Sequence, residues 1–222
     1  MTHLEQIKQN FIGSLNNSKK EDYPYTHWLL SDVFTDSDID ELLNLPFAAP
    51  RMDYSIGKRE TNNDKRGYFD VERRREYPIC DLISNALQSP EVIQSIENTC
   101  VVNLQRTYLR IEYAQDSSGF WLAPHTDIGV KKFTMLIYLS RDPDAPNWGT
   151  TIYKDAETVW GTVPSPSNHA LIFIPADNTW HGFEKRPVAG IRKSLIVNYV
   201  TDEWRARGEL AFPEAPIITR VN

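Results

Sequence analysis

The spacing of the hydrophobic positions changes near residue 99 of this 222-residue chain. Before that point, apolar side chains recur every three or four residues, which is the spacing of an amphipathic helix. The first such face consists of Leu4, Ile7, Phe11 and Leu15. We therefore expect residues 1–98 to form a helix-rich N-terminal part.

Two further stretches predict helices with recognisable ends. Residues 34–47 predict a helix that starts at Thr35, has Asp38 three residues on as in a capping box, and stops at Pro46. Residues 78–99 predict one or two more helices. The Ser-Pro pair at 89–90 interrupts this stretch, because proline cannot continue a helix that precedes it.

From about residue 99 the apolar segments are short, rich in β-branched and aromatic residues, and bounded by Gly, Pro, Asn or Asp. This pattern predicts strands at 100–114, 132–140, 149–155, 158–163, 169–176, 179–185 and 193–201. Many short strands separated by turns are typical of a sandwich or barrel. We expect one domain, 1–222, that is mainly β: a double-sheeted jelly roll over 99–203 follows the helical part, and 204–222 form a C-terminal extension.

The composition is that of a soluble globular protein, with 41% hydrophobic and 24% charged residues. No apolar run is long enough for a membrane helix, and the start lacks the layout of a secretory signal. We therefore expect a cytoplasmic protein without a membrane partner. The net charge of -6 argues against a nucleic-acid partner, because binding phosphates requires clustered Lys and Arg. Cys80 and Cys100 lack CxxC spacing and lie beside apolar residues, so we interpret them as core residues.

One basic segment, 51–75, stands out from the acidic balance of the chain. Its basic residues include Arg51, Lys58, Arg59, Lys65 and Arg66, and acidic residues are interleaved with them. Two interpretations stay open. The segment is either a solvated loop or a lid that recognises an anionic or zwitterionic small-molecule substrate.

The stretch WLAPHTDIGVKKFTMLIYLS at 121–140 contains the first candidate chemistry. In an extended chain, His125 and Asp127 share a face and can offer a nitrogen and an oxygen to one ion, although such a pair is also found solvated. His181, in the predicted strand 179–185, would supply a third ligand. Two His and one carboxylate form the facial triad of non-haem Fe(II) oxygenases, which leaves positions open for other ligands. His169 opens an apolar strand, and we interpret it as structural.

A possible carboxylate-binding pair follows the last histidine. On a strand, Arg192 and Ser194 share a face, and Lys193 between them points away. A guanidinium beside a hydroxyl binds a carboxylate through charge-assisted hydrogen bonds. An inward-facing Arg needs an anionic partner. That partner is either an acidic side chain of the protein or the distal carboxylate of a dicarboxylic co-substrate.

This order of residues resembles the Fe(II)- and 2-oxoglutarate-dependent dioxygenases. The family pattern of H-x-D, a distal H and then R-x-S is matched by HTD at 125–127, WHGF at 180–183 and RKS at 192–194. The stretch NWGTTIYKD at 147–155 is similar to a small-residue strand that the family has between its ligands. The resemblance covers roughly residues 100–201 and implies that the jelly roll is a double-stranded β-helix.

The resemblance also implies roles for the matched residues. His125, Asp127 and His181 would hold Fe(II) and form the catalytic centre. Arg192 would pair with the C5 carboxylate of 2-oxoglutarate, and Ser194 would hydrogen-bond it.

The implied cofactors are Fe(II), 2-oxoglutarate as co-substrate and O2. The implied reaction is hydroxylation, with decarboxylation of 2-oxoglutarate to succinate. If the basic segment 51–75 faces the pocket, we expect the substrate to be a small polar metabolite. Tyr108, which alternates with Arg110 on the strand before the metal loop, is a further candidate for contact with the co-substrate. Core or surface packing is the alternative for both.

Other functions remain alternatives. A hydroxylase of protein side chains would use the same residues. A cupin-like metal-dependent binding protein without redox turnover would not need Arg192 and Ser194, and a zinc hydrolase would use two His, one Asp and water. Asp127 disfavours halogenation, because halogenating relatives have a small residue there. Asn198 stands where nucleic-acid dealkylating relatives carry a second Arg, which disfavours that branch.

Overall fold

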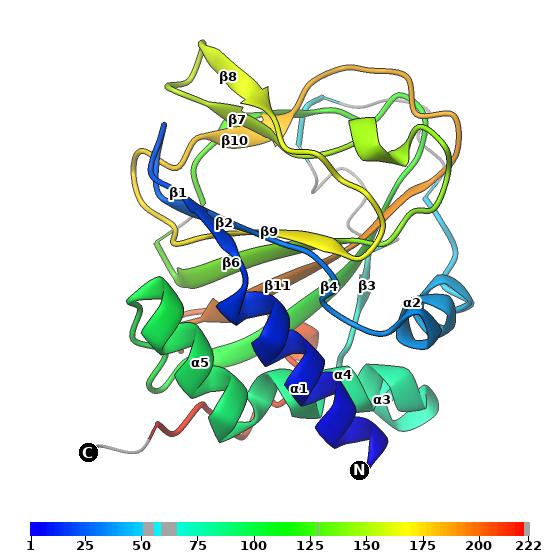
Figure 1. The fold of residues 1–222 in the computed structure, drawn as a ribbon, viewed down its shortest axis with the longest axis vertical. Coiled ribbons are helices and arrows are strands. Elements are labelled where there is room, and N and C mark those ends of the chain that lie inside the picture. Colours follow the sequence, from blue (N-terminus) through cyan, green and yellow to red (C-terminus); the bar gives the residue numbers. More distant parts are fainter. Residues whose placement is uncertain (51–55, 59–65, 128, 220–222) are drawn as a thin grey trace.

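The computed structural model describes residues 1–50, 56–58, 66–127 and 129–219, and its strands form two antiparallel sheets (Figure 1). The larger sheet contains β1 (Lys19–Glu21), β2 (His27–Leu30), β3 (Gly67–Tyr68), β4 (Tyr108–Asp116), β6 (Lys131–Tyr138), β9 (His169–Phe173) and β11 (Arg192–Val200). The smaller sheet contains β5 (Leu122–His125), β7 (Thr151–Tyr153), β8 (Val159–Thr162) and β10 (His181–Phe183). Their orders are β1-β2-β9-β6-β11-β4-β3 and β5-β10-β7-β8. The predicted mainly β architecture with added helices is therefore confirmed.

Helices cover the face of the larger sheet that points away from the smaller one (Figure 1). The helical segments are α1 (His3–Asn16), α2 (Asp36–Leu43), α3 (Val71–Glu76), α4 (Pro78–Gln88), α5 (Pro90–Cys100), η2 (Ala145–Asn147) and η3 (Arg207–Glu209). The capping box predicted at the start of α2 is present, with Thr35 and Asp38 each accepting from the other's backbone N–H. None of the helices in the described part of the chain has the length and apolar character needed to span a membrane.

The N-terminal part is not as purely helical as the sequence predicts. It contributes three strands, β1, β2 and β3, to the edges of the larger sheet. These strands have only two to four residues each, which is too short for an alternating pattern to be recognised. Strand β4 also begins later than predicted, at Tyr108, because α5 continues to Cys100 and ends at Val101 in the left-handed conformation with φ of 53°.

Alternation along the central strands separates two environments. In β11, Leu195, Val197 and Tyr199 belong to the main hydrophobic core, together with side chains of α1, α4 and α5. Ile196 belongs instead to a second cluster, which includes Leu136 of β6 and Ile152 of the smaller sheet. Side chains of one parity therefore hold the helices to the sheet, and those of the other parity face the space between the sheets.

Candidate functional site

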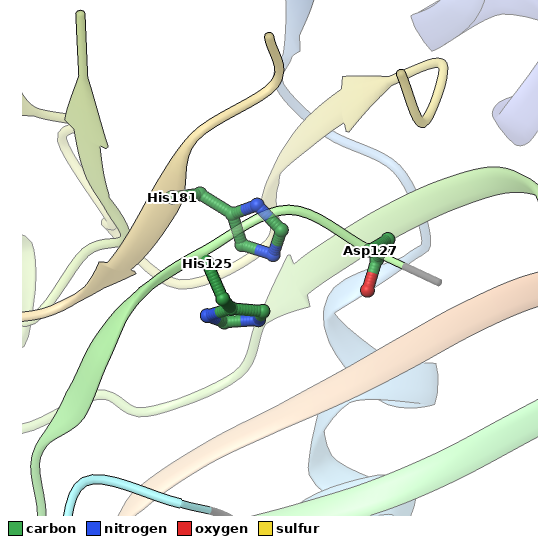
Figure 2. A group of neighbouring side chains, drawn as sticks. All are labelled: His125, Asp127 and His181. Atoms are coloured by element: carbon green, nitrogen blue, oxygen red, sulfur yellow. The ribbon is translucent and has the colours of Figure 1, made fainter. Parts of the chain in front are cut away.

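Two histidines of the smaller sheet lie side by side. Strand β10 pairs with β5 so that His181 is opposite His125, and their ring centroids are 4.3 Å apart. Asp127 follows β5 in the chain, and its carboxylate points towards the two imidazoles (Figure 2). One potential ligand atom from each residue lies within 4.8 Å of the other two. The structure thus brings together the three residues that the sequence singles out as metal ligands.

Backbone carbonyls orient both imidazole rings. The Nδ1 atom of His125 lies 2.8 Å from the carbonyl oxygen of Ala123, and Nδ1 of His181 lies 2.9 Å from that of Thr179. A carbonyl only accepts, so each Nδ1 donates and each Nε2 carries the lone pair that can bind a metal. Burial lowers the pKa of His181 to about 4, which keeps this ring neutral near pH 7.

The carboxylate of Asp127 is held through both oxygens. Lys131 Nζ lies 2.5 Å from Oδ1, and the Thr134 hydroxyl donates to Oδ2 at 2.6 Å. Burial opposes ionisation of this group, but the charge of Lys131, the charge that His181 carries when it is protonated at low pH, and the two hydrogen bonds outweigh it and lower the pKa of Asp127 to about 2. An ionised carboxylate and two imidazoles are donors that suit a divalent transition metal, so these residues fit Fe(II).

A glycine permits the close approach of the two strands that carry the histidines. A Cβ atom at Gly182 in β10 would lie 2.7 Å from the carbonyl oxygen of Leu122 and 3.2 Å from that of Ala123, both in β5. Any other residue at this position would push the backbones of β5 and β10 apart. The neighbouring pair, His125 and His181, would then separate.

We therefore expect Gly182→Ala to weaken metal binding by about tenfold or more and to lower the free energy of unfolding by about 1–3 kcal/mol, the usual cost of overpacking. Anaerobic Fe(II) titration and chemical denaturation measure the two effects. Gly161→Ala in β8 of the same sheet is the matched control, because a Cβ there meets nothing within 4 Å. Equal metal affinities of the two variants would contradict this role of Gly182.

A cavity of about 880 Å³ is lined by the three residues, together with side chains of the larger sheet. Its floor includes β4 and β11, whose register pairs Asp116 with Arg192 and Arg110 with Asn198. Six residues along a strand correspond to roughly 20 Å. The cavity therefore has two polar ends, and Ile196 and Leu136 line its apolar middle.

Arg192 occupies one end of this cavity and is only 3% exposed. Its Nε donates to the carbonyl oxygen of Trp148 at 2.6 Å, and its Nη1 donates to Oδ2 of Asp116 at 2.5 Å. Of the two partners that the sequence left open, the structure thus contains the acidic side chain. The neighbouring Ser194 has a buried Oγ without a hydrogen-bond partner among the described residues. A buried hydroxyl in this state fits a site that is completed by a polar ligand.

The structure does not bring Tyr108 to Arg192. Tyr108 pairs with Val200, and it lies roughly 26 Å along β4 from Asp116. The guanidinium of Arg207 lies 4.0 Å from the centre of its ring. This expectation depended on strand alternation alone, which predicts the face of a side chain but not its position along a cavity.

Sequence reasoning missed two polar residues near Arg192. The hydroxyl of Tyr138 donates to Thr150 Oγ1 at 2.9 Å, and the Arg192 guanidinium lies 5.8 Å from the centre of the Tyr138 ring. Thr150 lines the cavity. Tyr138 alternates with Thr134 and Leu136 along the same face of a strand that the sequence predicts. This alternation is the signal that could have identified Tyr138 as a residue near the cavity.

The basic segment 51–75 is only partly described. Arg51, Arg59 and Lys65 lie outside the described residues, so their expected role stays a prediction. Lys58 and Arg66 both line the cavity.

Comparison with known proteins shows that solved structures share the fold of this chain. The sequence matches no family model and no curated protein. Among solved structures, a prolyl 4-hydroxylase from Phytophthora capsici matches 93% of this chain and 68% of its own, with a TM-score of 0.61 and 14% identity. This chain has the fold of the prolyl hydroxylases.

Two further structures support the same assignment. A prolyl hydroxylase from Trichoplax adhaerens, in complex with a peptide fragment of the hypoxia inducible factor oxygen degradation domain, matches 91% of this chain and 93% of its own, with a TM-score of 0.58 and 16% identity. A prolyl-4-hydroxylase from Pseudomonas putida matches 88% and 98%, with a TM-score of 0.55 and 11% identity. At these identities the comparison establishes the fold, and the chemistry has to be argued from the site.

Proposed function

We propose that this protein is an Fe(II)- and 2-oxoglutarate-dependent oxygenase that hydroxylates a small polar metabolite. The observation that carries the proposal is the cluster of His125, Asp127 and His181, whose ligand atoms lie within 4.8 Å of one another on the wall of a cavity that Arg192 also lines. The prolyl hydroxylase fold supports it. It also agrees with the resemblance of the sequence to the 2-oxoglutarate-dependent dioxygenases.

The three residues would hold the metal through Nε2 of His125, Nε2 of His181 and a carboxylate oxygen of Asp127. Fe(II) bound there supplies oxidative chemistry in which O2 and 2-oxoglutarate convert a substrate C–H group to C–OH with release of succinate and CO2. Thr134 holds one oxygen of Asp127 through its hydrogen bond at 2.6 Å, which limits rotation of the carboxylate. The carbonyl oxygens of Ala123 and Thr179 limit rotation of the two rings in the same way.

Arg192 and Ser194 would bind the distal carboxylate of 2-oxoglutarate. The buried Ser194 hydroxyl without a partner among the described residues supports this assignment, because a carboxylate oxygen would accept a hydrogen bond from it. The Nε and Nη1 atoms of Arg192 bind Trp148 and Asp116. The third nitrogen, Nη2, has no hydrogen-bond partner among the described residues and can donate to the ligand. Phe183, Leu136 and Ile196 line the cavity with apolar surface, which keeps water from the reacting groups.

Hydroxylation of a protein side chain is the second candidate. It is supported by the fold that the chain shares with prolyl hydroxylases, one of which was solved with a peptide. Opposite charges inside the cavity support a small polar metabolite instead, and they are described below.

Anaerobic reconstitution followed by exposure to O2 tests the proposed function. We expect the protein with Fe(II) and 2-oxoglutarate to show a weak visible charge-transfer band, and O2 to produce succinate even without the primary substrate. Activity with zinc in the absence of O2 would favour a hydrolase. A protein that binds the metal but forms neither the band nor succinate would favour the cupin-like binding function.

A further inference from the structure

The end of the cavity remote from Arg192 contains four charged side chains in alternating order, which we call the charge ladder: Arg66, Glu112, Arg110 and Glu209. Arg66 donates to Glu112 through Nε at 2.9 Å and Nη2 at 2.5 Å. Arg110 donates to Glu112 through Nη2 at 3.1 Å and to Glu209 through Nε at 2.6 Å. The charge ladder thus runs from the guanidinium of Arg66 to the carboxylate of Glu209.

The two ends of the charge ladder are more accessible than its middle. The side chains of Arg110 and Glu112 are each 2% exposed, whereas Arg66 is 15% exposed and Glu209 is 19% exposed. All four line the cavity. Glu209 accepts a hydrogen bond through Oε2 only, and its Oε1 has no partner among the described residues. A ligand in the cavity thus meets a guanidinium at one end and a carboxylate at the other.

An unpaired hydrogen-bond donor lies beside the charge ladder. The Arg110 guanidinium lies 5.0 Å from the centre of the Trp204 ring, and Trp204 also lines the cavity. The indole Nε1 is buried and has no hydrogen-bond partner among the described residues. Leaving a buried N–H unpaired is costly, so this atom indicates the place of an acceptor on a ligand.

Two groups at this end of the cavity restrict what can bind. Glu209 offers a carboxylate oxygen, and Trp204 offers an N–H, neither of which has a partner among the described residues, so a ligand with both a cationic donor and an anionic acceptor satisfies both. A zwitterion adds no net charge. Its ammonium group can pair with Glu209, and its carboxylate can accept a hydrogen bond from the Trp204 indole close to the guanidinium of Arg110.

We infer that the charge ladder and Trp204 bind the head group of a small zwitterion, of the class of free α-amino acids, as the substrate of this site. That the bound zwitterion is the substrate rests on the proposed function. Binding itself requires neither iron nor 2-oxoglutarate. The two ideas can therefore fail separately.

Hydrogen bonds connect the charge ladder to the candidate metal centre. Arg110 Nη1 donates to Asn198 Oδ1 at 3.1 Å, and Asn198 Nδ2 donates to Thr134 Oγ1 at 2.9 Å. Thr134 in turn donates to Asp127 at 2.6 Å. These residues occupy adjacent positions on β4, β11 and β6, because Asn198 pairs with both Arg110 and Thr134. A head group held by the ladder therefore lies close to the metal ligands.

Calorimetry on the full chain without iron tests the inference with named probes. L-proline, L-leucine and L-lysine are each compared with their N-acetyl acids, their amides and their N-acetyl amides. We expect at least one free amino acid to bind about tenfold or more tightly than all three of its blocked forms, since each blocked form loses at least one hydrogen bond to a charged group.

Two conservative variants separate recognition from folding. Trp204→Phe keeps the aromatic contact with Arg110 but removes the N–H, and we expect about tenfold weaker binding of the free amino acid. Glu209→Gln removes the negative end of the ladder, so the affinity for the free amino acid should fall and the affinity for the N-acetyl acid should rise. If Glu209 had only a structural role, the variant would change both affinities in the same direction. Glu203→Gln, at an exposed position outside the cavity lining, is the matched control and should change neither.

Equal affinities for free and blocked forms, or no binding of any free amino acid, would overturn the inference. Tightest binding of an N-acetyl amide would also overturn it and would favour a residue within a protein chain. A free amino acid that binds as expected to a protein unable to form succinate would leave the zwitterion site standing and refute only the oxygenase.

Discussion

His125→Ala is expected to abolish the Fe(II)- and 2-oxoglutarate-dependent formation of succinate. His125 would supply one of only three protein ligands, and its ring lies 4.3 Å from that of His181. Loss of residues that merely support a metal ligand costs about 10–100-fold, so loss of the ligand itself should lower the rate by about a thousandfold or more. The visible band with 2-oxoglutarate should disappear in the same variant.

His169→Ala is the matched control for this change. His169 is also a strand histidine with Nδ1 close to a backbone carbonyl, that of Ser167 at 3.1 Å, but it does not line the cavity. Succinate formation should persist in this variant. A His125→Ala protein that kept both the band and turnover would show that the three residues are not the metal site.

Arg192→Met is expected to change both stability and the requirement for 2-oxoglutarate. It leaves the buried carboxylate of Asp116 without the ion pair that Arg192 forms at 2.5 Å, and breaking a buried pair from one side costs about 3–5 kcal/mol. The KM for 2-oxoglutarate should rise by about tenfold or more through loss of a charge-assisted bond. Denaturant titration and steady-state succinate formation measure the two effects.

Two companion variants distinguish these effects. The double variant Arg192→Met with Asp116→Leu removes both charges, so it should recover stability while its 2-oxoglutarate affinity stays low. Ser194→Ala removes a hydroxyl without a partner among the described residues, so stability should change by less than about 0.5 kcal/mol while the KM rises. If Ser194→Ala and the double variant both used 2-oxoglutarate like the unmodified protein, this end of the cavity would not be its binding site.

Much of the candidate site was predictable because it depends on local periodicity. His125 and Asp127 share a face through extended spacing, and so do Arg192 and Ser194, while Lys193 points away and donates to the backbone of Leu43. These relations follow from two-residue alternation, which holds whatever the partner strands are. The main core residues of α1 and α4 follow in the same way from helical spacing.

Other parts depend on which strands become neighbours. By strand alternation, Tyr108 and Tyr138 both lie on the face of the larger sheet that is turned towards the smaller sheet. Only the register of β4, β11 and β6 places Tyr138 near Arg192 and Tyr108 far from it. Asp116 lay beyond the predicted end of its strand, so its pairing with Arg192 was not foreseen. Strands β1 and β3 are too short to show any pattern of their own and form only by pairing with β2 and β4.

The chain by itself determined the order and spacing of the metal-binding candidates, because their chemistry is carried by residue types at short, regular intervals. Only the tertiary structure decided that Arg66, Arg110, Glu112 and Glu209 form one charge ladder, and that Asn198 and Thr134 connect it to Asp127. Those contacts join segments as far apart as Arg110 and Glu209, which are 99 residues distant in sequence. No local sequence pattern predicts these contacts, because they result from the registers in which strands far apart in the sequence pair and pack.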